Sequence, residues 1–230
     1  MLQKFFKRNE EKFILSPAQF KFVERVVKKH MSPDEHFRSS IHNIYFDTPQ
    51  DDLVIASIES PDYKYKVRAR SYGAKSADKI FFEIKSKLNG TVYKRRAIIN
   101  HDEYLSYLSD GKYNEDQVMN ELDYIFKEKS LMQKMYIAYD RSAYAANDDS
   151  DLRITFDTNL RSRIHELQVT KTDECEEYFP NETYIMEVKT KNGIPKWLLD
   201  ALLSKKIYST SFSKYGKIYQ KHNSKETNKC

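Results

Sequence analysis

Charged residues recur at every second position in several stretches of this 230-residue chain, with apolar residues between them. In the segment KYKVRARSYG, basic residues occupy positions 64, 66, 68 and 70, and Tyr65, Val67 and Ala69 lie between them. Successive side chains of a β-strand point to opposite faces of a sheet, so this period predicts strands with one apolar and one charged face. The same period recurs at positions 8–12, 83–87, 94–96, 139–141, 153 and 187–189. Such a chain must bury the apolar face of the sheet, and its charged face must contact either water or a ligand.

The simplest interpretation of a charged face is exposure to water, which is common in antiparallel sheets. Two features argue against it. No acidic residue interrupts the basic face from Lys64 to Arg70, and like charges on one face repel unless an anion neutralises them. Three strands also carry a Glu-x-Lys unit, at 10–12, 83–85 and 187–189. Since lysine and arginine bind phosphate oxygens and carboxylates hold Mg²⁺ or Mn²⁺, the pattern favours binding of a triphosphate with divalent ions.

Composition excludes several classes of protein. The 39 basic residues are nearly balanced by 34 acidic ones, for a net charge of +5, which does not suit a protein that coats nucleic acid. No run of about 18 apolar residues predicts a membrane-spanning helix, and the first residues do not resemble a secretory signal. Two cysteines make no disulfide framework. We therefore expect a cytoplasmic protein, whose membrane partner, if it has one, is a separate chain.

The period of the apolar residues and the positions of proline, glycine and asparagine predict strands and helices in alternation along the chain. Strands are expected at 5–15, 42–49, 61–73, 79–100, 134–144, 151–164, 167–172 and 183–191, with Asn89-Gly90 as a hairpin turn. Helices are expected from Ser16-Pro17 to His30, within 101–134, from Pro195 and from about Phe212. The segment 51–60 suits either a helix or a strand. We expect one domain over residues 1–222 and a disordered tail over 223–230.

Eight segments in this order resemble the VTC polyphosphate polymerase domain, a branch of the triphosphate tunnel metalloenzyme superfamily. They are EEKFIL, IYFDTP, KVRARSYG, FFEIKSKLNGTVYKRR, YDRSAY, LRITFDTNLRSR, IMEVKTKNGIPKWL and SFSKYG, and they cover roughly residues 5–220. The resemblance implies an α+β fold, a closed antiparallel β-barrel whose charged lumen forms a tunnel and whose outside is covered by helices. Eukaryotic members carry a further lysine just before FSK, where this chain has Ser211.

The resemblance also implies a reaction, the transfer of the γ-phosphate of ATP to a growing polyphosphate chain with Mn²⁺ or Mg²⁺. Residues expected to act in catalysis are Arg68, Arg70, Lys85, Arg141, Arg153 and Lys214. Residues expected to bind the substrate are Arg8, Lys12, Lys66, Lys94, Arg96 and Lys189. The expected metal ligands are Glu187, Glu83 and Glu10, of which the last two would alternatively orient a neighbouring lysine.

Two other functions stay open at this point. A hydrolase of the same superfamily would use the same lumen to cleave inorganic triphosphate or a nucleoside triphosphate, with water as the acceptor. A non-catalytic module would bind polyphosphate as a ligand, although it would have no need of the metal carboxylate Glu187. Two residues of the IYFDTP segment are assigned structural roles: Tyr45 to the core or a helix-facing position, and Asp47 to a turn.

Overall fold

The structure is a computed structural model that describes residues 9–73, 78–89, 91–114, 116–148, 151–171, 175–179 and 183–227. The chain divides into two compact units, each formed by three separate stretches. The first unit comprises residues 1–40, 139–160 and 177–212, and the second comprises residues 41–138, 161–176 and 213–230. The single domain expected from the sequence stays a prediction.

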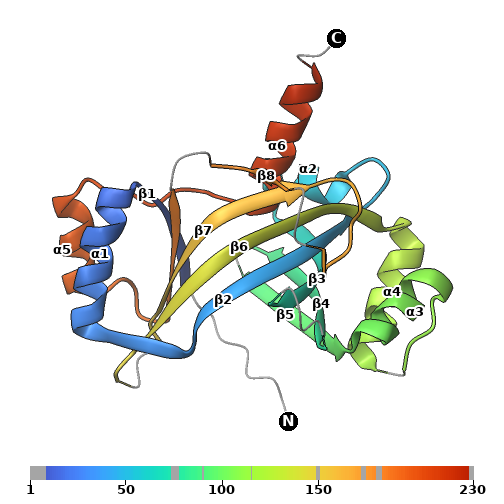
Figure 1. Cartoon of the computed structure of the whole chain (residues 1–230), viewed down its shortest axis with the longest axis horizontal. Coiled ribbons are helices and arrows are strands. Elements are labelled where there is room, and N and C mark those ends of the chain that lie inside the picture. Colours follow the sequence, from blue (N-terminus) through green and yellow to red (C-terminus); the bar gives the residue numbers. More distant parts are fainter. Residues whose placement is uncertain are drawn as a thin grey trace. The chain divides into compact units, whose positions relative to one another are not determined.

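Strands and helices alternate along the described residues (Figure 1). The strands are β1 (Asn9–Leu15), β2 (Met31–Asp47), β3 (Tyr63–Tyr72), β4 (Ile80–Leu88), β5 (Thr91–Ile99), β6 (Met132–Ala146), β7 (Arg153–Arg163), β8 (Glu176–Glu177) and β9 (Tyr184–Thr190). The helices are α1 (Pro17–His30), α2 (Asp52–Glu59), α3 (His101–Asp110), α4 (Gln117–Lys129), α5 (Lys196–Ser204) and α6 (Lys214–Thr227). No helix within the described ranges is long and apolar enough to cross a membrane.

These strands form a sheet of order β1-β9-β7-β6-β2-β3-β4-β5, with β8 beside β7. The pairs β1–β9, β2–β3, β3–β4, β4–β5 and β7–β9 are antiparallel, in agreement with the α+β prediction. Each end strand pairs on one side only, β1 with β9 and β5 with β4, and over the described residues no pairing joins β1 to β5. The closed barrel is therefore not confirmed.

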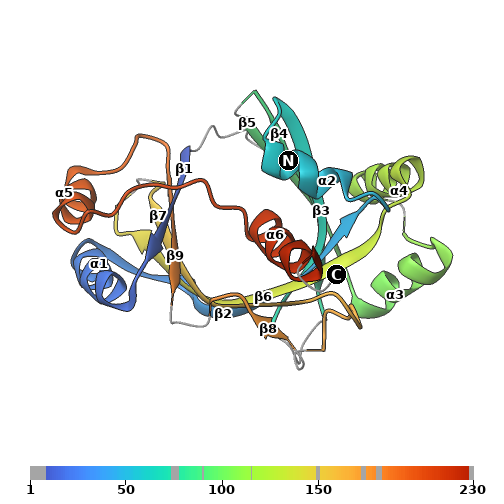
Figure 2. The same cartoon turned by 90° about the horizontal axis from the view of Figure 1, so that it is seen from above.

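In the first unit, α1 and α5 lie side by side (Figures 1 and 2). Their apolar stripes share one buried cluster with the strands, which includes Val23 and Val27 of α1, Leu198 of α5 and Phe13 of β1. Helix α1 begins as the sequence predicts, with Pro17 in the first turn and Ser16 accepting a hydrogen bond from the Gln19 amide at 3.3 Å. The opposite face of these strands carries the charges.

In the second unit, the apolar face of the sheet packs against α3 and α4. Val67 and Ala69 of β3 and Phe82 of β4 are fully buried there, together with Tyr104 of α3 and Leu122 of α4. The three apolar residues follow the alternation read from the sequence, so the basic side chains of β3 lie on the other face. The Asn89-Gly90 hairpin is confirmed, since Leu88 pairs with Thr91 across a two-residue loop.

Several segments differ from the sequence expectations. Strand β2 begins at Met31, whereas a strand was expected only from His42. The segment left open at 51–60 forms helix α2. Over the described residues 167–171 the expected strand does not form, because Arg163 donates to the carbonyl oxygens of Glu166 at 3.2 Å and Gln168 at 2.7 Å and so holds the backbone in a turn. Residue 172 lies outside the described ranges. The expected disordered tail is helical through Thr227, the end of α6, and residues 228–230 lie outside the described ranges.

Candidate functional site

The charged face of β3, β4 and β5 in the second unit is organised around one buried carboxylate, that of Glu83. Its register partners are Arg68 on β3 and Arg96 on β5. Arg68 approaches Glu83 Oε2 with both Nε and Nη2 at 2.8 Å, and Lys94 Nζ pairs with Oε1. Burial raises the pKa of Glu83, but the charges of Arg68, Arg70 and Lys94 outweigh it and lower the pKa to about 2. Glu83 is therefore a fixed anion that orients two cations.

A tyrosine that sequence reasoning assigned to the core or a helix-facing position belongs to this charged face. Tyr45 of β2 pairs in register with Arg68, and its hydroxyl lies 3.2 Å from Arg68 Nη1. Burial raises the pKa of the Tyr45 phenol, yet Arg68, Arg70 and Lys214 together lower it below its ordinary value. The signal for this placement was the strand period, since Tyr45 and Asn43 share parity and Asn43 Oδ1 accepts from Arg70 Nε at 2.9 Å.

The SFSKYG segment meets the same face at the start of α6. Lys66 Nζ donates to Ser213 Oγ at 2.8 Å, and the charge of Lys214 acts on Tyr45. Next to Lys214, the ring of Tyr215 stacks on that of Tyr45, with centroids 4.5 Å apart. Lys66 and Lys214 therefore lie with the arginines of β3 on one face of the second unit, and their role in binding stays a prediction.

Asp47, expected in a turn, lies behind this arrangement as a structural residue. It is fully buried and accepts hydrogen bonds from the amides of Leu53 at 2.8 Å and Val54 at 2.9 Å, at the start of α2. Its second oxygen also accepts from the Tyr215 hydroxyl at 2.9 Å. Asp47 thus caps α2 and fixes the residue that follows Lys214.

Lysines occupy the next rung of this face. Lys66, Lys85 and Lys94 are register partners on β3, β4 and β5. Burial and the nearby arginines lower the pKa of Lys94 to about 8, against the opposing effect of Glu83. Arg96 is exposed and lies over the ring of Phe81, 5.3 Å from its centroid. The charged face is therefore densely cationic, which suits a polyanionic ligand.

The first unit presents a second charged face. Arg141 of β6 binds Asp157 of β7 through two hydrogen bonds of 2.6 and 2.8 Å, and its Nη2 lies 3.6 Å from Glu187 of β9. Burial lowers the pKa of Arg141, but these two carboxylates and Tyr139 raise it well above its ordinary value. Asp157 is completely buried in this role, and the charge pattern alone did not single it out.

The other predicted residues of the first unit form separate ion pairs and do not gather around one buried carboxylate. Lys12 Nζ lies 3.0 Å from Glu10 Oε1, and Lys189 Nζ lies 3.7 Å from Glu187 Oε2 and 4.0 Å from Glu10 Oε2. Arg153 is exposed and pairs with Asp34 at 2.6 Å. Arg8 lies outside the described residues.

The expected divalent cation can be tested against these carboxylates. Glu10 and Glu187 face one common cation, the ammonium of Lys189, so their oxygens converge on a position suited to positive charge. Thr155, the register partner of Glu187, keeps a buried hydroxyl that has no hydrogen-bond partner in the described part of the chain. This donor set fits a hard cation, even though the described residues contain no preformed group of three or more His, Cys, Asp or Glu. Glu83 fits less well, because it is fully buried and Arg68, at 2.8 Å, and Lys94 hold its two oxygens, whereas Glu187 lies 3.6 Å or more from its cationic neighbours Arg141 and Lys189.

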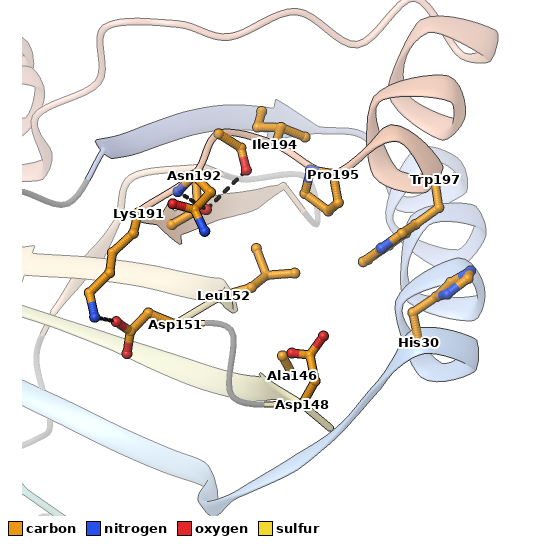
Figure 3. A pocket seen from close by; sticks show the side chains of 12 residues that line it. His30, Ala146, Asp148, Asp151, Leu152, Lys191, Asn192, Ile194, Pro195 and Trp197 are labelled. Atoms are coloured by element: carbon orange, nitrogen blue, oxygen red, sulfur yellow. Dashed lines mark hydrogen bonds and ion pairs between the residues drawn. The ribbon is translucent and has the colours of Figure 1, made fainter.

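The first unit also contains a cavity of about 270 Å³ that is separate from these clusters (Figure 3). Its wall includes the stacked rings of His30 and Trp197, 4.4 Å apart, and the ion pair of Lys191 with Asp151. Among the residues that the structure describes, none of the predicted site residues lines this cavity. The candidate sites are therefore the two charged faces, one in each unit, and not this cavity.

Comparisons with known proteins identify the family of this chain. The model of the VTC domain family matches residues 7–223. Among solved structures, a candidate adenylate cyclase from Bacillus halodurans is similar at 15% identity, covering 89% of this chain and 92% of that one, with a TM-score of 0.55. A candidate adenylyl cyclase from Hippeastrum, for which a dominant triphosphatase activity is described, is similar at 17% identity, covering 90% and 92% of the two chains, with a TM-score of 0.51. The likeness to these two proteins concerns the fold, whereas the family match spans nearly the whole sequence, and the chain belongs to the VTC-domain family.

Proposed function

We propose that this protein is a polyphosphate polymerase that transfers the γ-phosphate of ATP to the end of an inorganic polyphosphate chain. The proposal depends on one observation, that two arginine side chains are each held in place by a buried carboxylate. Arg68 is held by buried Glu83 and Arg141 by buried Asp157, so each guanidinium is oriented before any ligand arrives. Phosphoryl transfer depends mainly on positioning and charge neutralisation, which such fixed cations supply.

Membership of the VTC family and the contacts within each unit support the residue roles that we propose. A terminal phosphate oxygen of the acceptor chain attacks the γ-phosphorus, the bond to the β–γ bridging oxygen breaks, and ADP leaves with that oxygen. The basic residues proposed to bind the phosphates and neutralise the charge that develops are Lys12, Lys66, Arg68, Arg70, Lys85, Lys94, Arg96, Arg141, Arg153, Lys189 and Lys214.

Mn²⁺ or Mg²⁺ would neutralise phosphate oxygens as a Lewis acid when bound. We propose Glu187 and Glu10 as its protein ligands, because both already face the ammonium of Lys189. Glu83 is assigned to orienting Arg68 and Lys94, the alternative role that the sequence left open for it.

A triphosphatase is the second candidate. The same cationic faces would bind inorganic triphosphate or a nucleoside triphosphate, and water would replace the acceptor phosphate. The triphosphatase activity described for the Hippeastrum protein of similar fold supports this alternative. A third candidate, a module that binds polyphosphate without turnover, is less consistent with the converging carboxylates.

One assay separates the three functions. The purified protein is incubated with ATP and Mn²⁺, with and without a short polyphosphate primer, and the products are resolved on a gel. The proposal predicts long phosphate chains together with ADP. Orthophosphate without chains would identify a hydrolase, and tight polyphosphate binding without turnover would identify a binding module.

The metal assignment has its own test. Glu187→Gln removes one carboxylate charge at the proposed cation position, so we expect metal-dependent turnover to be lost while tripolyphosphate still binds in calorimetry. Glu11→Gln is the matched control, since Glu11 lies on the same pair of strands but opposite Val188, on the other face. Full activity of Glu187→Gln would refute the assignment.

A further inference from the structure

The cavity of about 270 Å³ in the first unit carries an inference that is independent of the proposed function. Three parts of the chain line it: the end of α1, the end of β6 with the residues just before β7, and the connection from β9 to α5. In Figure 3, the side chains of Trp197, Asp148 and Leu152 point from different walls toward the same space. The cavity therefore places an indole ring, a carboxylate and an aliphatic side chain around one small ligand volume.

The connection from β9 to α5 gives this cavity a fixed wall. The Thr190 hydroxyl donates to the Gly193 carbonyl oxygen at 2.9 Å and accepts from the Asn192 amide at 3.2 Å, as the dashed lines in Figure 3 show. The ring of His30 stacks on that of Trp197, with centroids 4.4 Å apart and the planes 12° from parallel, which holds the indole in place. These walls are formed before a ligand arrives, so binding requires little ordering of side chains.

The ionisable groups of the cavity lining favour a cation. Asp148 and Asp151 contribute two carboxylates, and Lys191 contributes one ammonium group, which pairs with Asp151. With His30 neutral, the described lining carries one excess negative charge. An anion such as a phosphate would meet both carboxylates at close range, so the cavity discriminates against the ligands expected at the basic faces.

The rest of the lining is apolar, and this determines which kind of cation fits. Ala146, Leu152, Ile194 and Pro195 surround the space together with the ring of Trp197. A hard metal ion takes about six oxygen ligands, and the described residues contain no group of three or more His, Cys, Asp or Glu that could hold one. An alkylammonium ion suits both parts of the lining, because its charge pairs with a carboxylate and lies favourably against an indole, while its alkyl chain contacts the apolar side chains.

We propose that this cavity binds a small organic ammonium ion, a primary amine that carries a short alkyl chain. Its ammonium group pairs with Asp148 and lies beside the ring of Trp197, and its alkyl chain packs on Leu152 and Pro195. The basic residues proposed to bind phosphate are not part of this site, so the protein holds ligands of opposite charge at different places.

The test uses Trp197, the single tryptophan of the chain, because its fluorescence and its indole N–H resonance report on this cavity alone. The full chain is titrated with pentylamine, 1-pentanol and pentanoate, which have matched alkyl chains and carry a positive, no and a negative charge. Pentylamine should change both signals saturably, with a dissociation constant of about 1 mM, as expected for a ligand of few atoms. Pentanol should bind about tenfold more weakly, and pentanoate should not bind. Sodium chloride of equal ionic strength should leave both signals unchanged.

Three variants test which residues bind the amine. Asp148→Asn removes the carboxylate and should weaken pentylamine binding about tenfold. Because Asp148 is exposed, this variant is expected to fold. Lys191→Gln removes the competing ammonium group and should strengthen binding about threefold. Asp200→Asn is the matched control, since it makes the same change of charge on α5 at an exposed residue that does not line the cavity, and it should leave the affinity unchanged.

An equal response to pentylamine and pentanol would overturn the proposal, because it would show an apolar cavity without recognition of charge. Unchanged affinity in Asp148→Asn, equal weakening by Asp148→Asn and Asp200→Asn, or the absence of any saturable signal would also overturn it. The titration contains no ATP, polyphosphate or metal, so its outcome does not depend on whether the polymerase proposal holds.

Discussion

At the scale of single residues, the site depends on buried carboxylates that hold cations. Glu83 is fully buried, and its pKa of about 2 lies below the ordinary value of 4.5. The difference corresponds to about 3 kcal/mol of stability. A carboxylate with a depressed pKa stabilises the fold above its unfolded-state pKa, so this contribution is present above about pH 4.5 and is lost as the pH falls towards 2.

Glu83→Gln should therefore lower the free energy of unfolding at neutral pH by about 3 kcal/mol, because it leaves Arg68 buried without its charged partner. Urea denaturation measures the change. The variant should also lose part of the acid sensitivity of the wild type. Glu121→Gln is the control, since Glu121 pairs with exposed Arg95 and its removal should change stability by less than about 0.5 kcal/mol. Equal stability of both variants would contradict the role of Glu83.

Lys94 supplies a prediction about pH and binding. Its pKa in the free protein is about 8, and a bound polyanion favours the charged ammonium. Above pH 8 the ligand must therefore bind together with a proton, so tripolyphosphate affinity should fall by up to about tenfold per pH unit between pH 8 and pH 10. Lys94→Arg, which stays charged, should remove this pH dependence in calorimetric titrations. An unchanged pH profile in that variant would show that another group titrates.

At the scale of elements, two helices are connected through one buried side chain. Asp47 accepts from the amides that begin α2 and from Tyr215 of α6, and Gly216 follows at a close approach, where an added Cβ would lie 3.2 Å from Ile58 of α2. The Asp47–Tyr215 bond joins residues 168 positions apart. This contact holds the segment that presents Lys214.

Asp47→Ala should destabilise the second unit by about 2–4 kcal/mol, because it removes the cap of α2 and leaves a buried hydroxyl without its acceptor. Tyr215→Phe removes one hydrogen bond only and should cost about 1 kcal/mol. Thermal and urea unfolding of the two single variants and the double variant measure the coupling between them. Strict additivity would contradict a shared hydrogen bond.

The sequence predicts best those elements whose ends are fixed by residues only a few positions away. The capping residues of α1 and the hairpin at Asn89 act within a few positions, and both were predicted. Helix α2 could not be distinguished from a strand, because its start is capped by Asp47 from outside the helix. The strand predicted at 167–172 was wrong for a similar reason. Arg163 donates hydrogen bonds to the carbonyl oxygens of Glu166 and Gln168, which in a strand would accept from a neighbouring strand.

At the scale of the whole molecule, like-charged faces make stability depend on the ligand. A polyanion that binds only the folded chain should raise the melting temperature, and at one hundred times its dissociation constant it stabilises by about 2.7 kcal/mol. Differential scanning fluorimetry with tripolyphosphate and Mn²⁺ should show this shift, whereas sodium chloride of equal ionic strength should not. The absence of a shift at saturating ligand would contradict binding to the native faces.

The sequence by itself determined most of the strands, their two faces and the family, because strand period and helix caps are local properties and because eight motifs occur in order. Only the tertiary structure decided which side chains meet. The register of β2 and β3 brings Tyr45 to Arg68, and the pairing of β4 with β3 and with β5 brings Glu83 to Arg68 and to Lys94. The period assigns a residue to a face, but its partner on the next strand depends on register, which is set by contacts between residues far apart in the chain.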